Sequence, residues 1–149
     1  FPLHKAVLMD DPDCRVLSLL LGLGADVDCR DDHGNTPLVV APYFSAGAEM
    51  CKVLLDNGAD VNAAGDEGNT ALMSASESLN AAAVELLMDR GADENKKNNE
   101  GKLALQLVLE NDDPEVPQWS KAQCAGALGG EVSLKEMEER IDEALTSCD

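Results

Sequence analysis

The chain has 149 residues, the size of a single domain, and its 29 Asp and Glu against 11 Lys and Arg give a formal net charge of −18 at pH 7. This charge argues against sequence-independent binding to nucleic acid and against docking on an anionic membrane, because both need clustered cations. Hydrophobic residues make up 44% of the chain and aromatic residues 3%, so we expect a core of Ala, Val, Leu and Met in closely packed helices.

Cysteine usage predicts a reducing compartment. Five scattered cysteines without a Cys-x-x-Cys pair, and only two histidines, indicate reduced thiols in the cytoplasm or nucleus, with no disulfide framework and no metal site. The sequence has no basic leader before an apolar stretch and no apolar run of about 18 residues, so we expect neither a signal peptide nor membrane insertion. Because the chain begins with Phe1 rather than Met, we interpret it as a processed or excised piece.

Three short patterns recur along the chain in one order: a helix start that contains Leu, a Val/Leu segment and a Gly-Ala-Asp turn. The turn begins at Gly24, Gly58 and Gly91, which are 34 and then 33 residues apart. The leucines of the helix starts keep the same phase; they are Leu3, Leu38, Leu72 and Leu105. Three patterns in one phase predict a repeat protein, with units at about 1–31, 32–65 and 66–98 and a degenerate unit at 99–111.

The second unit shows why each repeat is expected to fold as two helices. Thr36 suits a helix N-cap and Pro37 the first helical position. A Val/Leu stripe then marks a second helix, which ends before Gly58. Residues 62–68 carry turn residues that are typical of a hairpin. Each unit is too small to bury its own apolar face, so the units must stack.

The period and the Thr-Pro-Leu-x-x-Ala sequence at residues 36–41 closely resemble the ankyrin repeat. The resemblance covers about residues 1–111. Only the first unit keeps the motif histidine, His4, and the fourth unit has Leu103 and Ala104 in place of Thr-Pro. The resemblance implies an all-α solenoid of stacked helix-turn-helix units with short β-hairpin or turn tips, plus a C-terminal helix.

Residues 112–149 break the repeat, and we expect them to form an irregular segment followed by a helix. Residues 126–130 indicate a flexible joint. Ser133 and Glu136 then have the spacing that is typical of a capping box. An apolar stripe follows at Leu134, Met137, Ile141 and Leu145. This helix either caps the last repeat or docks elsewhere, and both alternatives stay open.

The chain has no catalytic, phosphate-binding or metal-binding motif. Its carboxylates are scattered over predicted hairpins and helix ends. Asp26, Asp60 and Asp93 recur at matching repeat positions, which favours a structural role for them. We therefore predict a protein that is not an enzyme and that needs no cofactor or metal.

In the ankyrin family the hairpin tips and the exposed side of each first helix usually bind a partner, and the resemblance implies the same surface here. The matching positions are Leu8, Met9, Asp32, His33, Tyr43, Phe44, Asp66, Glu67 and Glu77. They run from apolar and aromatic to acidic, so we predict a protein partner with a basic or mixed basic-apolar segment. Two alternatives remain: Phe44 folds inward, or the acidic side chains serve only solubility.

Two other functions are compatible with the sequence. The spacing of Leu54 and Asp60 before Asn62, repeated before Asn95, resembles that of ankyrin asparagines hydroxylated by an oxygen-sensing dioxygenase. The fit of asparagine to turns favours a structural role for both residues. Alternatively, the chain is a structural fragment of a larger ankyrin-repeat scaffold, channel or pathogen effector.

Overall fold

The computed structural model of the chain describes residues 2–9, 14–111, 114 and 118–128. The helices are α1 (Pro2–Leu8), α2 (Arg15–Gly22), α3 (Pro37–Val40), η1 (Ala41–Tyr43), α4 (Gly47–Asp56), α5 (Ala71–Glu77), α6 (Ala81–Asp89), α7 (Ala104–Glu110) and α8 (Gln118–Ala127). The expected C-terminal helix after Ser133 lies outside the described residues. Over the described part of the chain, no helix is long and apolar enough to cross a membrane.

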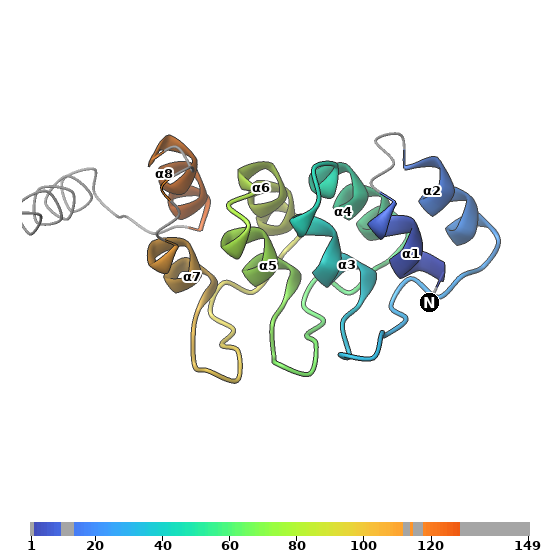
Figure 1. The fold of residues 1–149 in the computed structure, drawn as a ribbon, viewed down its shortest axis with the longest axis horizontal. Helices are drawn as coiled ribbons and strands as arrows, with labels where there is room; N and C mark the ends of the chain where they lie inside the picture. The colour runs from blue at the N-terminus through green and yellow to red at the C-terminus, as the bar shows by residue number, and fades with distance from the viewer. Residues whose placement is uncertain (1, 10–13, 112–113, 115–117, 129–149) are drawn as a thin grey trace, which may run out of the picture.

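The helices pair in sequence, and the pairs stack side by side along one direction (Figure 1). The first helices form one layer, in which α1 packs on α3, α3 and η1 pack on α5, and α5 packs on α7. The second helices form the other layer, in which α4 packs against α2 and α6, and α6 packs against α8. The loops between units all project to the same side (Figure 1). This arrangement confirms the expected all-α repeat solenoid.

The predicted ends of the second helices are confirmed at the Gly-Ala-Asp turns. Gly24, Gly58 and Gly91 have φ values of 90°, 88° and 86°, in the left-handed region that glycine adopts without a steric cost. At the second of these turns, Gly58 N donates to Leu55 O at 3.0 Å and Ala59 N donates to Leu54 O at 3.1 Å. The terminal carbonyls of the helix are thereby satisfied.

The predicted N-cap at Thr36 is confirmed in its position but not in its hydrogen bond. Thr36 takes the extended N-cap backbone conformation, but its side chain makes no capping hydrogen bond. Thr70, one unit further on, does accept a hydrogen bond from Met73 N, at 3.4 Å. In the fourth unit Leu103 N instead donates to the side chain of Gln106 at 2.8 Å. The start of the first helix is therefore closed differently in the second, third and fourth units.

The loop tips are tight turns rather than extended hairpins. Each is closed by a backbone hydrogen bond across five residues: Asp31 N to Asn35 O, Gly65 N to Asn69 O and Asn98 N to Lys102 O, at 3.0–3.1 Å. Within the described ranges the β pairing is limited to an isolated antiparallel bridge between Ala64 and Thr70. The tips are thus short and fixed at their base.

The core runs through the whole stack and consists mainly of small and aliphatic side chains, as the composition predicts. Its largest fully buried members include Leu3, Leu17, Leu38, Met50, Leu54, Leu72, Met73 and Leu87. Free cysteines at positions 14, 51 and 124 are also buried in it. The side chains at the centre are compact, so neighbouring helices approach closely and each unit covers the apolar face of the next.

The stack continues past residue 111, the predicted end of the repeats. Helix α8 packs on both α6 and α7; its Cys124 and Ala125 are buried, and so is Leu128 directly after it. It is therefore the second helix of a fourth unit. The repeat pattern did not predict α8 because the connection from α7, residues 111–117, is longer than the connection from α5 to α6, residues 78–80. Its buried face also has Cys and Ala in place of a Val/Leu stripe, and Gly126, expected in a flexible joint, lies inside the helix.

Candidate functional site

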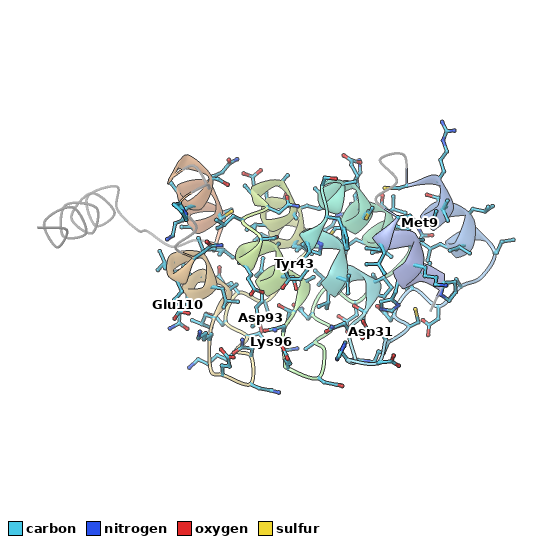
Figure 2. All side chains as sticks on the ribbon, viewed as in Figure 1. Met9, Asp31, Tyr43, Asp93, Lys96 and Glu110 are labelled. Carbon is cyan, nitrogen blue, oxygen red and sulfur yellow. The ribbon has the colours of Figure 1, made fainter. Side chains whose placement is uncertain are left out.

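A hollow of about 450 Å³ lies on the side of the stack that carries the loop tips, between the second and third units. Its lining comes from two tips and two first helices: His33, Asn35, Val39, Val40, Tyr43, Asp66, Glu67, Asn69 and Ser74. Figure 2 shows Tyr43 near the middle of the stack, between Met9 at one end and Glu110 at the other. The hollow therefore occupies the centre of the surface on which a partner was expected.

Hydrogen bonds between neighbouring tips hold the rim of the hollow in place. Asp66 N donates to His33 O at 3.1 Å, and Asn99 N donates to Glu67 O at 3.0 Å. The side-chain amide of Asn99 also donates to Asp66 O at 2.8 Å. These bonds use backbone atoms of Asp66 and Glu67, whose side chains are exposed. The Glu67 carboxylate also accepts a hydrogen bond from the side-chain amide of Asn69, at 3.4 Å. The negative charges of Asp66 and Glu67 are therefore carried by loop tips whose backbone is held by hydrogen bonds.

Tyr43 is the phenolic side chain of the hollow. It ends η1, is 50% exposed, and its hydroxyl donates to Glu77 Oε2 at 2.5 Å. Partial burial, followed by the hydrogen bond to this carboxylate, raises the pKa of Tyr43 to about 12. The phenol therefore stays protonated at neutral pH, and Glu77 restrains its ring.

Phe44 does not accompany Tyr43 at the surface. Its backbone is extended, with φ −103° and ψ 159°, and its partly buried side chain packs against the hydrophobic core. The inward alternative is therefore the one adopted. Tyr43 therefore lines the hollow, whereas Phe44 packs against the core.

The apolar positions predicted in the first unit lie outside the hollow. Leu8 is 58% exposed and ends α1, and Met9 follows it with 68% exposure. Met9 lies on the amino-terminal side of Tyr43 (Figure 2). Asp32 is exposed at the tip beside His33, but it is not part of the lining.

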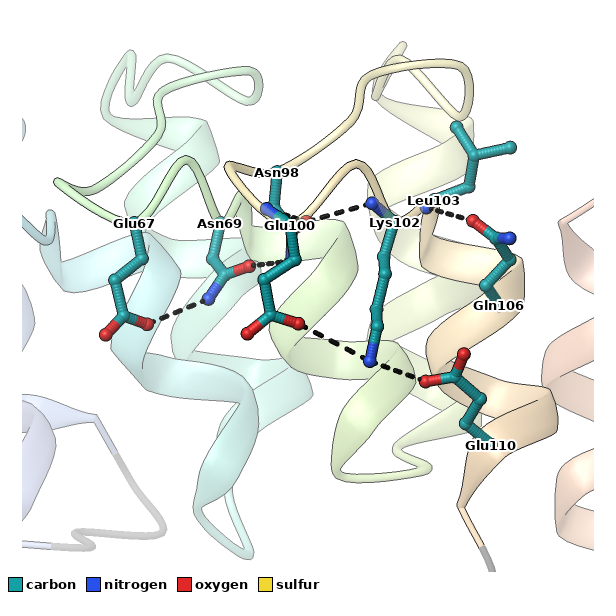
Figure 3. A network of polar contacts seen from close by, with 8 residues as sticks. All are labelled: Glu67, Asn69, Asn98, Glu100, Lys102, Leu103, Gln106 and Glu110. Atoms are coloured by element: carbon teal, nitrogen blue, oxygen red, sulfur yellow. Dashed lines mark hydrogen bonds and ion pairs between the residues drawn. The ribbon is translucent and has the colours of Figure 1, made fainter.

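The acidic side chains are neutralised unevenly along the stack. In the fourth unit Lys102 Nζ lies 2.7 Å from Glu110 Oε2 and 3.4 Å from Glu100 Oε2 (Figure 3). Asp66, Glu67 and Glu77 form no ion pair within the part of the chain that the structure describes. The carboxylates around the hollow therefore lack the ion pairs that neutralise Glu100 and Glu110 in the fourth unit.

The sequence did not single out five of the lining residues: Asn35, Val39, Val40, Asn69 and Ser74. Their positions within the repeat unit were the signal that could have identified them. Val39 and Val40 follow Leu38 within the helix-start motif, and Asn35 and Asn69 precede the two N-cap threonines. Mapping a groove from these positions requires knowing which neighbouring units face each other, and only the three-dimensional stack provides that.

Asn62 links two units through its side chain. Its Oδ1 accepts a hydrogen bond from Asp93 N at 2.7 Å, and its Nδ2 donates to Gly91 O at 3.5 Å. Asp28, one unit earlier, accepts from Asp60 N at 3.1 Å in the same way. This repetition supports the structural role of Asn62. The side chain of Asn95 is exposed.

The repeated aspartates close the turns that follow the second helices. Asp26, Asp60 and Asp93 each accept a hydrogen bond from the backbone N–H two residues later, at 3.1, 3.0 and 2.9 Å. This is the Asx-turn geometry that short carboxylates favour. Their recurrence therefore has the structural cause that the sequence indicated.

Chemical reactivity is suppressed at the buried thiols. Burial raises the pKa of the Cys51 thiol to about 12 and, together with the negative charge of Glu85, raises that of Cys124 to about 11. Among the described residues no group of His, Cys, Asp and Glu is arranged to hold a metal ion.

Comparison with known families gives a match over most of the chain. The family model for ankyrin repeats (3 copies) matches residues 3–98 and, in an overlapping register, residues 44–119. The second match ends at residue 119, at the start of α8. No curated protein matches the sequence significantly.

Proposed function

Because the chain belongs to the ankyrin-repeat family, we propose that it binds a basic or mixed basic-apolar segment of a partner protein through the loop tips and the adjoining side of the first helices. Ankyrin repeats are generally protein–protein interaction modules, and the family is typically non-enzymatic. The finer choice of a basic segment rests on this chain's own residues. The observation that carries it is the hollow with uncompensated carboxylates beside Tyr43.

The last residues of the first helices support a segment of mixed character. Leu8, Tyr43, Glu77 and Glu110 end α1, η1, α5 and α7, and η1 continues α3, which packs between α1 and α5. The row therefore changes from apolar through aromatic to acidic, and Glu110 is already paired with Lys102. A partner with an apolar residue near α1 and basic residues near α3 and α5 complements this row.

Tyr43 has the properties of a binding hot spot. An aromatic ring contributes a large contact area at a small entropy cost, and this ring is half exposed and restrained by Glu77. The acidic tips add long-range attraction, which accelerates the encounter with a basic segment. Replacing Tyr43 by Ala is therefore expected to weaken binding by about 2 kcal/mol.

Selection from a displayed library of random peptides tests the proposal on the chain alone, before any natural partner is identified. We expect the selected peptides to be enriched in Arg and Lys, and to associate more slowly as salt is raised. They should bind the Tyr43→Ala variant weakly and the Glu94→Gln variant normally, since Glu94 is exposed but outside the hollow. Selected peptides without excess positive charge, or with unchanged affinity for Tyr43→Ala, would contradict the proposal.

A further inference from the structure

We infer that the hollow between the second and third units is a guanidinium site, which takes up one arginine side chain of the partner between the Tyr43 ring and the carboxylates of Asp66 and Glu67. The inference rests on the proposed function and specifies the residue that the partner inserts. It follows from the shape of the hollow, its charge and the chemistry of its walls.

The hollow has the size and walls to accept one long side chain. Its volume of about 450 Å³ is within the range of pockets that enclose small ligands. Val39 and Val40 give it an apolar side along α3, suited to the aliphatic stem of a long cationic residue. Asn35 and Asn69 add polar groups at the tips. An apolar wall next to an acidic rim matches the two parts of an arginine side chain.

The charge of the hollow is available to a ligand. Asp66 and Glu67 line it with exposed side chains, and neither forms an ion pair within the described ranges. The lysines of the next tip are already used: Lys102 lies between Glu100 and Glu110, and Lys96 Nζ donates to Asn62 O at 2.8 Å. These two lysines are therefore engaged elsewhere. Arg30 does lie at the tips beside the hollow, but its guanidinium donates to the backbone oxygens of Gly34 and Ala64, each at 2.7 Å, and not to a carboxylate.

The single phenol ring favours arginine over other cations. A guanidinium is planar, so it stacks on one aromatic face while its edge donates to carboxylates. A compact ammonium gains less from a single flat wall, and methylated lysine is bound by cages of several aromatic rings. Among Phe, Tyr and Trp side chains, the lining contains Tyr43 alone. Its hydroxyl is held by Glu77, so the ring is restrained before a ligand arrives.

A small probe tests the site independently of any peptide. The full chain, labelled with ¹⁵N, is titrated with N-acetyl-arginine N-methylamide and followed by amide chemical shifts. N-acetyl-citrulline N-methylamide, which has nearly the same shape without the charge, is the control ligand. We expect saturable shifts from the arginine probe at residues 33–35, 43 and 66–69, with a dissociation constant in the millimolar range. Equal responses to both probes, or shifts confined to other surfaces, would overturn the inference.

Matched variants assign the contacts. Glu67→Gln keeps the size of the side chain and a hydrogen-bond acceptor for Asn69, so the tip should stay folded. We expect this variant and Tyr43→Ala each to weaken the arginine probe about threefold, the scale of exposed ionic and cation–π contacts. Glu94→Gln should bind it as the natural chain does. Unchanged binding by Glu67→Gln and Tyr43→Ala would refute the assignment.

The two proposals fail separately. If selected peptides are basic but the arginine probe shows no preference over citrulline, the guanidinium site is wrong and the peptide-binding function stands. If the probe binds the hollow but selection yields no basic peptides, the hollow recognises guanidinium and the proposed peptide-binding function is wrong.

Discussion

The orphaned hydroxyl of Thr36 gives a sharp test of the packing between units. Among the described residues, Thr36 Oγ1 is a buried side-chain oxygen without a hydrogen-bond partner. Its counterpart in the next unit, Thr70, caps α5 by accepting from Met73 N. Both side chains are almost fully buried, with 0% and 2% exposure. The same Thr→Val substitution at the two positions should therefore have opposite effects.

The magnitudes follow from the two environments. A buried hydroxyl without a partner costs about 1–3 kcal/mol, and valine fills nearly the same space without it. Thr36→Val should therefore raise the free energy of unfolding by about 1 kcal/mol. Thr70→Val removes an N-cap acceptor, and should lower the free energy of unfolding by about 1 kcal/mol. Each change corresponds to about 3 °C in the melting temperature for a chain of this length.

Urea denaturation measures both variants against the natural chain. The expected result is a higher midpoint for Thr36→Val and a lower midpoint for Thr70→Val, with unchanged m values. If Thr36→Val lowers the midpoint as much as Thr70→Val does, the Thr36 hydroxyl has a stabilising partner and the reasoning is refuted.

Three further predictions follow from individual side chains. Tyr43, the only tyrosine of the chain, should titrate near pH 12 in near-ultraviolet absorbance, and Glu77→Gln should lower that pKa toward its ordinary value. Because the folded-state pKa is above the unfolded one, the free energy of unfolding should fall as pH rises from about 10 to about 12. Cys51 has a pKa of about 12, so only about one part in ten thousand of its thiol is thiolate at pH 8. Mass spectrometry should therefore find Cys51 unlabelled by a thiol reagent until the chain unfolds. Labelling in the native state would contradict its burial. Asn62→Ala should lower the free energy of unfolding by about 1 kcal/mol because Asp93 N loses its hydrogen-bond acceptor. Asn62→Asp should lower it less in the same urea assay. Equal losses in the two variants would show that the acceptor is unimportant.

The sequence predicted those features whose cause is local. Gly58 ends its helix because a left-handed residue is needed there, and Asp60 closes the following turn with its own side chain. Both causes lie within a few neighbouring residues. They recur in each unit, so the repeat and its fold class could be predicted from one chain.

Features that depend on contacts between units were missed. The sequence could not show that Phe44 turns toward the core, because that depends on the space left between helix pairs. Helix α8 was not predicted because its buried residues, Cys124 and Ala125, form no Val/Leu stripe. Its partners, α6 and α7, are known only from the three-dimensional stack. The hollow is likewise a property of two units, so only its rim residues were predicted.

The most direct test of the binding surface is the footprint of the tightest selected peptide, measured by hydrogen–deuterium exchange on the full chain. We predict protection at the tips and first helices of the second and third units, in residues 32–43 and 66–77. Protection confined to α2, α4 and α6, the opposite layer of the stack, would contradict the proposed surface.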